Sequence, residues 1–164
     1  MPNCRSASAA RAGCDAVGVI RSIDLSAEGV AESVVDIQRA AYRVEADLIG
    51  FDDIPPLHED APQVRQHRLK WLGSWEGDRL AGVIGWTLDG GVCDIDRLAV
   101  HPDFARRGHG RGLVRKLLNH RMITVSTGTE NAPARRLYES LGFVRVGEVR
   151  TSPEVTTTQY VRRT

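Results

Sequence analysis

Apolar residues recur at three- and four-residue steps along the segment that follows residue 26. The positions are Val30, Val34, Ile37, Ala41, Val44 and Leu48. This spacing places one apolar stripe on a helix and predicts a long amphipathic helix with Asp24 or Ser26 as its cap. Gly50 stands where a left-handed C-cap residue is favoured, so we expect the helix to end there.

Residues 51–60 contain two consecutive prolines, Pro55 and Pro56, among several acidic side chains. Because proline disfavours helical geometry in the residue before it, this stretch is predicted to be an irregular acidic loop. A shorter helix is predicted over residues 61–69.

The remaining apolar runs are short and alternate with polar residues, which is typical of strands. The predicted strands are residues 17–21, 71–76, 79–88, 92–100, 121–126, 143–149 and 155–162. Two further helices are predicted, one ending near Asn119 and one capped by Asn131. In strand 92–100 every second residue should share one face. These residues are Asp94, Asp96, Leu98 and Val100.

Length and composition limit the classes of protein. The chain has 164 residues, of which 41% are hydrophobic and 26% charged, as in a globular protein with one domain. We expect that domain over residues 17–164, after a disordered tail over 1–16. The net charge of +1 argues against a nucleic-acid-binding surface. No run reaches the ~18 apolar residues of a membrane span.

Cys4, Cys14 and Cys93 are odd in number and have no metal-ligand spacing. The histidines show no such spacing with acidic or cysteine partners either. We therefore expect free thiols, no bound metal and a cytoplasmic location.

Three glycines alternate with other residues in the segment Arg106–Gly112, directly before an apolar helical pattern. Gly108, Gly110 and Gly112 carry no Cβ, so a ligand can press against the backbone. The first N–H groups of the following helix have no intrahelical partner and, with the helix dipole, favour an anion. Arg106, Arg107 and Arg111 add positive charge, so the segment predicts a phosphate-binding turn.

Neither of the common nucleotide loops fits this turn. A Walker A loop requires Lys followed by Ser or Thr, and Gly112-Leu113 stand there instead. A dinucleotide loop requires a strand immediately before its first glycine, and residues 101–105 intervene here. Taken alone, the turn is also compatible with a flexible Arg/Gly loop that contacts nucleic acid.

A second motif follows in residues 131–143, which read as a helix capped by Asn131 and ended by Gly142. Together with Arg107–Gly112, the run Asn-Ala-Pro-Ala-Arg-Arg-Leu-Tyr-Glu-Ser-Leu-Gly-Phe resembles the GCN5-related N-acetyltransferase (GNAT) superfamily. The resemblance covers roughly residues 17–164. It implies an α/β fold: a mixed, mostly antiparallel sheet of about seven strands, splayed at one strand pair and flanked by about four helices.

The resemblance implies acetyl-CoA as co-substrate and assigns contacts to it. The pantetheine arm would lie between strands 92–100 and 121–126, against the backbone of Leu98, Ala99 and Val100. A backbone N–H near Val100 would stabilise the oxyanion. The further expected contacts are Arg106, Arg107, Gly108, His109, Gly110, Arg111, Gly112, Asn131, Ala134 and Tyr138.

The resemblance also implies catalytic roles. Tyr138 would protonate the leaving thiolate, although a core aromatic is the common role of a helical tyrosine. Asp94 is the expected base that deprotonates the amine, and Asp96 is the second candidate, unless it pairs with Arg97. Direct transfer needs no covalent intermediate, and alternation along the strand should point Cys93 away from both carboxylates.

Several acceptors remain compatible with this chemistry. The expected activity is direct acetyl transfer to a primary amine of a small molecule or peptide, and the acidic loop 51–60 would suit a cationic acceptor. The alternatives are acetylation of protein N-termini, including ribosomal ones, and a non-catalytic acyl-CoA-binding domain. A homodimer is compatible with the family, and neither nucleic acid nor membrane is expected as a partner.

Overall fold

The seven strands and the four predicted helices follow one another in the expected order, and two short helical turns, at Pro55–His58 and Pro102–Phe104, are additional. The structure, a computed structural model, describes residues 18–164. The predicted tail, with Val17, Cys4 and Cys14, lies outside the described residues. The elements are β1 Val19–Ser22, α1 Val30–Ile49, α2 Pro55–His58, α3 Ala61–Gln66, β2 Lys70–Glu76, β3 Arg79–Asp89, β4 Val92–Val100, η1 Pro102–Phe104, α4 His109–Arg115, β5 Met122–Gly128, α5 Ala132–Ser140, β6 Val144–Arg150 and β7 Thr156–Arg163.

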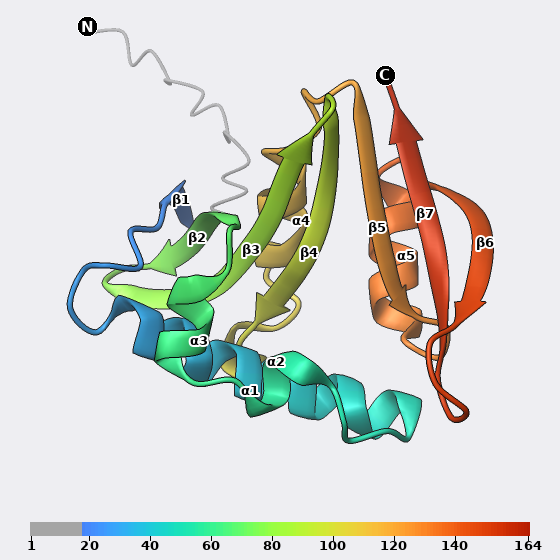
Figure 1. Ribbon diagram of the computed structural model, residues 1–164. Coiled ribbons are helices and arrows are strands. Elements are labelled where there is room, and N and C mark those ends of the chain that lie inside the picture. The colour runs from blue at the N-terminus through green and yellow to red at the C-terminus, as the bar shows by residue number, and fades with distance from the viewer. Residues whose placement is uncertain (1–17) are drawn as a thin grey trace, which may run out of the picture.

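All seven strands form one sheet in the order β1-β2-β3-β4-β5-β7-β6. Every neighbouring pair is antiparallel except β4 and β5, which run parallel. The parallel pairing covers only Val92–Ile95 and Met122–Val125, and beyond it the two strands diverge (Figure 1). The expected splay between these strands is therefore confirmed.

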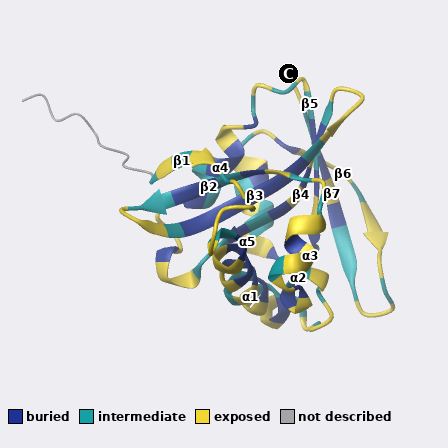
Figure 2. Ribbon diagram, turned by 60° about the vertical axis from the view of Figure 1, so that its left-hand side comes forward, coloured by how far each residue is buried: buried dark blue, intermediate teal, exposed yellow. Residues whose placement is uncertain are grey.

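Helices cover both faces of the sheet and divide the core into two clusters. On one face α4 and α5 bury residues such as Ile84, Leu113 and Tyr160. On the other face α1, α2 and α3 bury Val34 and Val83 among others. Figure 2 shows the buried residues concentrated where strands and helices meet, whereas the edge strand β6 is largely exposed. The fold matches the expected α/β class.

The long first helix ends as predicted but begins later. Gly50 is its left-handed C-cap, whereas the residue before its first turn is Gly29, not Asp24 or Ser26. Asp24 instead accepts hydrogen bonds from the Ser26 backbone N–H and hydroxyl in a separate turn. Within residues 18–164, none of the helices is long and apolar enough to cross a membrane.

The loop prediction for residues 51–60 is wrong in its centre. Pro55 begins a single helical turn, α2, because proline is tolerated at the first position of a helix, where its missing N–H would have no partner anyway. Asp60 then caps α3 through a capping box with Gln63.

A β-bulge interrupts the expected alternation of β4. Gly85 of β3 pairs with Arg97 and Trp86 pairs with Ile95, so Asp96 is an extra residue on β4. After this bulge the faces exchange: Leu98 packs into the cluster that also holds Ile95 and Cys93. The prediction that Leu98 and Val100 share a face with Asp94 is therefore wrong. Cys93 does point away from the exposed Asp94, as expected.

Candidate active site

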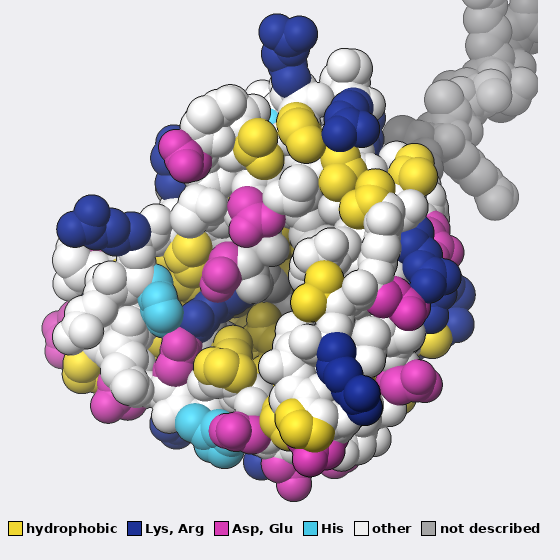
Figure 3. All heavy atoms as spheres, turned by 45° about the vertical axis from the view of Figure 1, so that its right-hand side comes forward, with side chains coloured by type: hydrophobic (Ala, Val, Ile, Leu, Met, Phe, Trp, Pro, Cys, Tyr) yellow, Lys and Arg dark blue, Asp and Glu magenta, His cyan; other side chains and the backbone are white. Residues whose placement is uncertain are grey.

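A cavity of about 220 Å³ opens where β4 and β5 separate. Figure 3 shows the hollow, with carboxylate side chains along one side and hydrophobic atoms at its base. Five residues expected at the site line it together: Asp96, Leu98, Asn131, Ala134 and Tyr138. The other lining residues are Tyr42, Glu45, Ile54, Pro56, Ile95, Arg97, Val125, Ser126 and Thr127.

Tyr138 presents an unpaired hydroxyl to this cavity. Tyr138 is 3% exposed, and its ring packs edge-on against that of Phe143, with centroids 5.4 Å apart. The hydroxyl makes no hydrogen bond with any residue of the described part of the chain, although a buried tyrosine usually finds a partner. Burial, with a smaller contribution from the Glu45 charge, raises the pKa of Tyr138 well above its usual value. The phenol therefore stays protonated near neutral pH and can donate a proton.

Tyr160 shows what a buried tyrosine with a structural role looks like in the same core. Its hydroxyl donates to Glu139 at 2.7 Å and accepts from Arg135 at 3.3 Å. Tyr138 lies beside it, with ring centroids 6.2 Å apart, yet has neither partner. The comparison favours a ligand-facing role for Tyr138.

The helix that carries Tyr138 is placed by its cap. Asn131 accepts a hydrogen bond from the Ala134 N–H at 3.2 Å, as expected for an N-cap, and both residues line the cavity. Gly142 has a φ of +85°, so the chain turns back directly after α5 into β6.

The sequence did not identify Glu45 and Tyr42 as site residues. They lie three residues apart on α1, so they share a helix face, and both line the cavity from the side opposite α5. The helical pattern could indicate that face, but not that it reaches across the divided sheet. Burial raises the pKa of Glu45, and the Asn131 side chain and the Gly128 backbone N–H oppose that effect.

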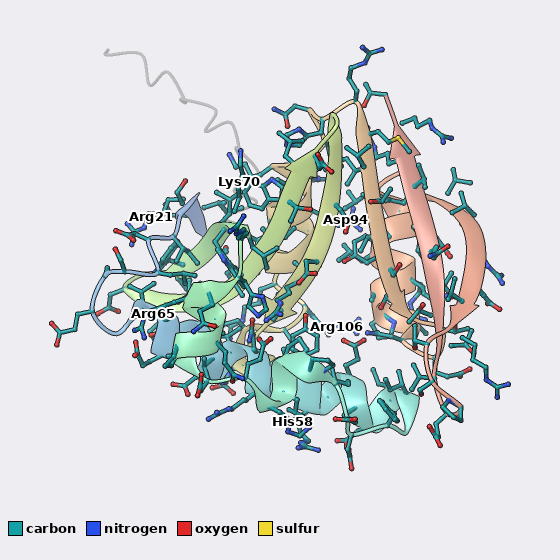
Figure 4. The ribbon with its side chains drawn as sticks, viewed as in Figure 1. Arg21, His58, Arg65, Lys70, Asp94 and Arg106 are labelled. Carbon is teal, nitrogen blue, oxygen red and sulfur yellow. The ribbon has the colours of Figure 1, made fainter. Side chains whose placement is uncertain are left out.

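The two aspartates expected as bases lie in different environments. Asp94 is exposed, accepts a hydrogen bond from the Thr124 hydroxyl and is absent from the cavity lining. Figure 4 shows it on β4 beside β5, where the two strands are still paired. Asp96 does line the cavity, but its Oδ2 accepts from Arg97 Nε at 2.9 Å.

Arg97 is the centre of a buried charge network beneath the cavity. Its side chain, 6% exposed, points toward α1 and α2, where it binds both carboxylate oxygens of Glu59 and the Gln38 side chain. His67 hydrogen-bonds Glu59 at 2.8 Å. The acidity of loop 51–60 is thus partly structural, and the residues it presents to the cavity are the apolar Ile54 and Pro56.

The phosphate-binding turn lies outside the cavity lining, at the start of α4. Gly108 has a φ of +88° and Arg106 has one of +62°, which is unusual for a residue other than glycine. Gly110 and Gly112 lie in α4 and do not have positive φ. A Cβ on Gly110 would lie 3.6 Å from both Leu137 and Val100, so this glycine keeps free the space between β4 and α5.

The side chains of Arg107, Arg111 and His109 in the turn each contact other residues of the protein. Arg107 pairs with Glu76 at 2.8 Å, and Arg111 donates to the Ser140 hydroxyl at 2.7 Å. His109 is 1% exposed and both of its ring nitrogens are engaged, by Ser74 and by Glu76, so its predicted contact with a cofactor stays a prediction.

Backbone groups along the second half of β4 complete the arrangement. No strand among residues 18–164 pairs with the β5-facing edge of Leu98–Val100, because the parallel ladder ends at Ile95. Free N–H and C=O groups there can bind the amides of an extended ligand.

Burial raises the pKa of the Cys93 thiol to about 11, so this residue is unsuited to act as a nucleophile.

Comparison with known proteins gives the same family. The acetyltransferase (GNAT) family model matches residues 31–143, more than half of the chain. The chain is 34% identical over 125 residues to the UPF0157 protein YqkA of Bacillus subtilis (strain 168); the alignment covers 74% of this chain and 36% of YqkA. It is 32% identical over 120 residues to the N-alpha-acetyltransferase RimI of Mycobacterium tuberculosis, covering 68% of this chain and 75% of RimI.

Solved structures share the fold at lower identity. The ribosomal-protein-S18-alanine N-acetyltransferase of Escherichia coli superposes with a TM-score of 0.70 at 18% identity, covering 88% of this chain and 92% of that one. YncA of Salmonella typhimurium, solved with its cofactor acetyl-CoA, gives a TM-score of 0.67 at 18% identity, covering 88% and 92%.

Proposed function

Because the chain belongs to the acetyltransferase (GNAT) family, an acyltransferase family that uses acetyl-CoA, we propose that it transfers the acetyl group directly to a primary amine. The observation that carries this proposal is the unpaired Tyr138 hydroxyl in the cavity between β4 and β5. A domain that only bound acyl-CoA would not require a protonated phenol at that point.

The proposed cofactor site runs from the turn to the cavity. The N–H groups at the start of α4, with Arg106 nearby, would receive the pyrophosphate. The open edge of β4 from Leu98 to Val100 would bind the pantetheine amides, and a backbone N–H near Val100 would stabilise the oxyanion. Asn131 and Ala134 would line the end of the channel next to the thioester.

The bound thioester then needs a proton donor for its sulfur. Tyr138 is suited to that role, because its phenol is protonated and reaches the same cavity. Acetyl-CoA supplies the acetyl group, while the protein positions the carbonyl and protonates the departing thiolate. The acceptor amine would enter from the side of α1 and α2, where Tyr42, Ile54 and Pro56 line the cavity.

A screen of amines tests the proposal. Wild-type protein is mixed with acetyl-CoA and a panel of small primary amines and short peptides, and the release of free thiol is measured. Acetylated product and thiol should appear in equal amounts for at least one amine. Tyr138→Phe serves as the internal control for chemistry in the cavity. Absence of product with every class of amine would contradict the proposal.

A polypeptide N-terminus is the second candidate acceptor. It is supported by the identity with RimI, whose alignment covers most of both chains. Two peptides of the same sequence, one with a free α-amine and one blocked there but carrying a lysine, separate α-amine from side-chain acetylation. Preference for small amines over both peptides would exclude this candidate.

A further inference from the structure

We propose that Glu45 of α1 is the general base that removes a proton from the acceptor ammonium. This assignment rests on the proposed function and names the residue that makes the acceptor reactive. An ammonium group cannot attack a thioester until it loses a proton, so a base must lie on the side from which the amine arrives.

The two faces of the divided sheet place an acid and a base on opposite sides of the cavity. α5 covers one face and brings Tyr138, whereas α1 crosses the other face below β4 and reaches toward β5 (Figure 1). The cavity therefore passes between Tyr138 on the cofactor side and Glu45 on the acceptor side. Tyr42, Glu45 and Tyr138 line the same cavity, so the three groups lie near one another.

Close contact with β5 holds Glu45 in place. A Cβ built on Gly128 would lie 2.9 Å from Ile49 Cγ2 and 3.8 Å from Glu45 Oε1. The end of β5 thus abuts the last two turns of α1, and only a residue without a side chain allows this approach. Glu45 Oε1 lies beside this contact, and Glu45 lines the cavity.

Among the described residues, no cation pairs with the Glu45 carboxylate, although the Asn131 side chain and the Gly128 backbone N–H lie against it. The other titratable and charged groups that line the cavity are Tyr42 on the same helix face, Asp96 and Arg97 on β4, and Tyr138 on α5. The single cation among them, Arg97, is already bound by Glu59 and Asp96. Burial without a cationic partner raises the pKa of Glu45, which moves it toward the range in which a base works near neutral pH.

The other nearby carboxylates are less suited to the role. Asp94 lies outside the cavity lining and is held by the Thr124 hydroxyl. Asp96 lies at the cavity, but its Oδ2 already accepts a hydrogen bond from Arg97 Nε at 2.9 Å. Glu45 alone among these three combines a place at the cavity with the absence of a cationic partner among the described residues.

The proposed proton transfers balance over one turnover. Glu45 takes one proton from the ammonium, and the neutral amine attacks the carbonyl carbon, so the C–N bond forms. As the C–S bond breaks, Tyr138 gives its proton to sulfur and regains one from the nitrogen of the new amide. Glu45 then releases its proton to solvent. The products are the acetylated amine, free CoA thiol and one proton.

Rate profiles against pH test the assignment, with the most active amine of the screen as acceptor. Glu45→Gln should lower kcat/KM roughly 100-fold at pH 7, within the usual range for loss of a general base. The deficit should shrink as the pH approaches the pKa of the amine, because the free amine then needs no base. Asp47→Asn, an exposed carboxylate on the same helix, is the matched control and should leave the profile unchanged.

Asp94→Asn completes the comparison. If Asp94→Asn shows this pH-dependent loss and Glu45→Gln keeps the wild-type profile, the proposal is overturned. A purely structural role for Glu45 would lower the melting temperature of Glu45→Gln without changing the shape of the profile, and that result also overturns it.

A titration that needs no acceptor separates this inference from the proposed function. In protein labelled with 13C at the glutamate carboxyl groups, the signal lost in Glu45→Gln identifies Glu45. That signal should titrate at a higher pH than those of the exposed glutamates. Titration at the ordinary pH refutes the assignment even if the screen finds an acceptor. A screen without product refutes the proposed function and leaves the titration to decide the ionisation of Glu45.

Discussion

Replacement of Tyr138 by phenylalanine removes one proton-donating hydroxyl from the cavity and keeps the ring. The ring and its edge-on contact with Phe143 at 5.4 Å remain in Tyr138→Phe. The hydroxyl has no hydrogen-bond partner in residues 18–164, so no protein hydrogen bond is lost. The free energy of unfolding should therefore change by less than about 1 kcal/mol, which is the usual net value of one hydrogen bond.

The effect on the reaction should be much larger. Loss of a general acid typically costs about 100-fold in kcat, which corresponds to about 2.7 kcal/mol of transition-state stabilisation. Affinity for acetyl-CoA should hardly change, because the interaction is made only as the thiolate leaves. Steady-state kinetics with a confirmed acceptor, together with calorimetric titration of CoA, measure the two effects separately.

Tyr160→Phe provides a matched control in the same core. Its hydroxyl is bound by Glu139 and Arg135, so its loss should destabilise the protein by about 1 kcal/mol and leave kcat near the wild-type value. The reasoning is refuted if Tyr138→Phe turns over at the wild-type rate, or if both variants lose activity in proportion to their stability. Tyr138 would then be a packing residue, and catalysis would rest on the oxyanion contact and on positioning.

Three further predictions concern ligand binding and stability. Gly110→Val should abolish the rise in melting temperature that acetyl-CoA causes. The free protein should stay folded, because a Cβ at this position meets its neighbours only at contact distance, 3.6 Å. An undiminished rise would exclude the site, and NAD or ATP should stabilise the wild type much less than acetyl-CoA does. Gly128→Ala should cost about 1–3 kcal/mol in urea denaturation, because its Cβ would lie 2.9 Å from Ile49. Burial alone would raise the pKa of Glu59, but hydrogen bonds from Arg97 and His67 lower it. Ionised Glu59 therefore stabilises the fold above the pKa of an unfolded glutamate, about 4.3, and this stabilisation is lost as the pH falls below that value. Acid should lower the melting temperature of Glu59→Gln less steeply than that of the wild type.

Local sequence signals were sufficient for most elements and for one side of the site. The stripe on α1, the turn at Gly108 and the cap Asn131 each depend on residues close together in the chain, so their pattern predicts them. Tyr138 follows from the same helical pattern as Asn131. Two helix starts were predicted incorrectly, after Gly29 and at Pro55. At both places more than one local backbone conformation is allowed, and the hydrophobic pattern does not distinguish between them.

The acceptor side was not predictable in the same way. Glu45 reaches the cavity only because α1 crosses the sheet where β4 and β5 diverge, and no local pattern encodes that crossing. His109 appeared to belong to the turn, yet Ser74 and Glu76, more than thirty residues earlier, determine where its imidazole lies. Contacts of this kind depend on the register between strands, which alternation along one strand does not fix.

One irregularity of β4 accounts for both halves of the candidate site. Ile95 is the last residue paired with β5, and the bulge at Asp96 follows immediately. The bulge bends the strand away from its neighbour, which leaves the edge of Leu98–Val100 open to a ligand. It also exchanges the faces, so Arg97 turns toward α1 and α2 and binds Glu59 there. A regular strand would leave Arg97 on the opposite face. The bulge thus opens the proposed cofactor channel. Because it also directs the nearest cation to Glu59, Glu45 has no cationic partner among the described residues on the proposed acceptor side.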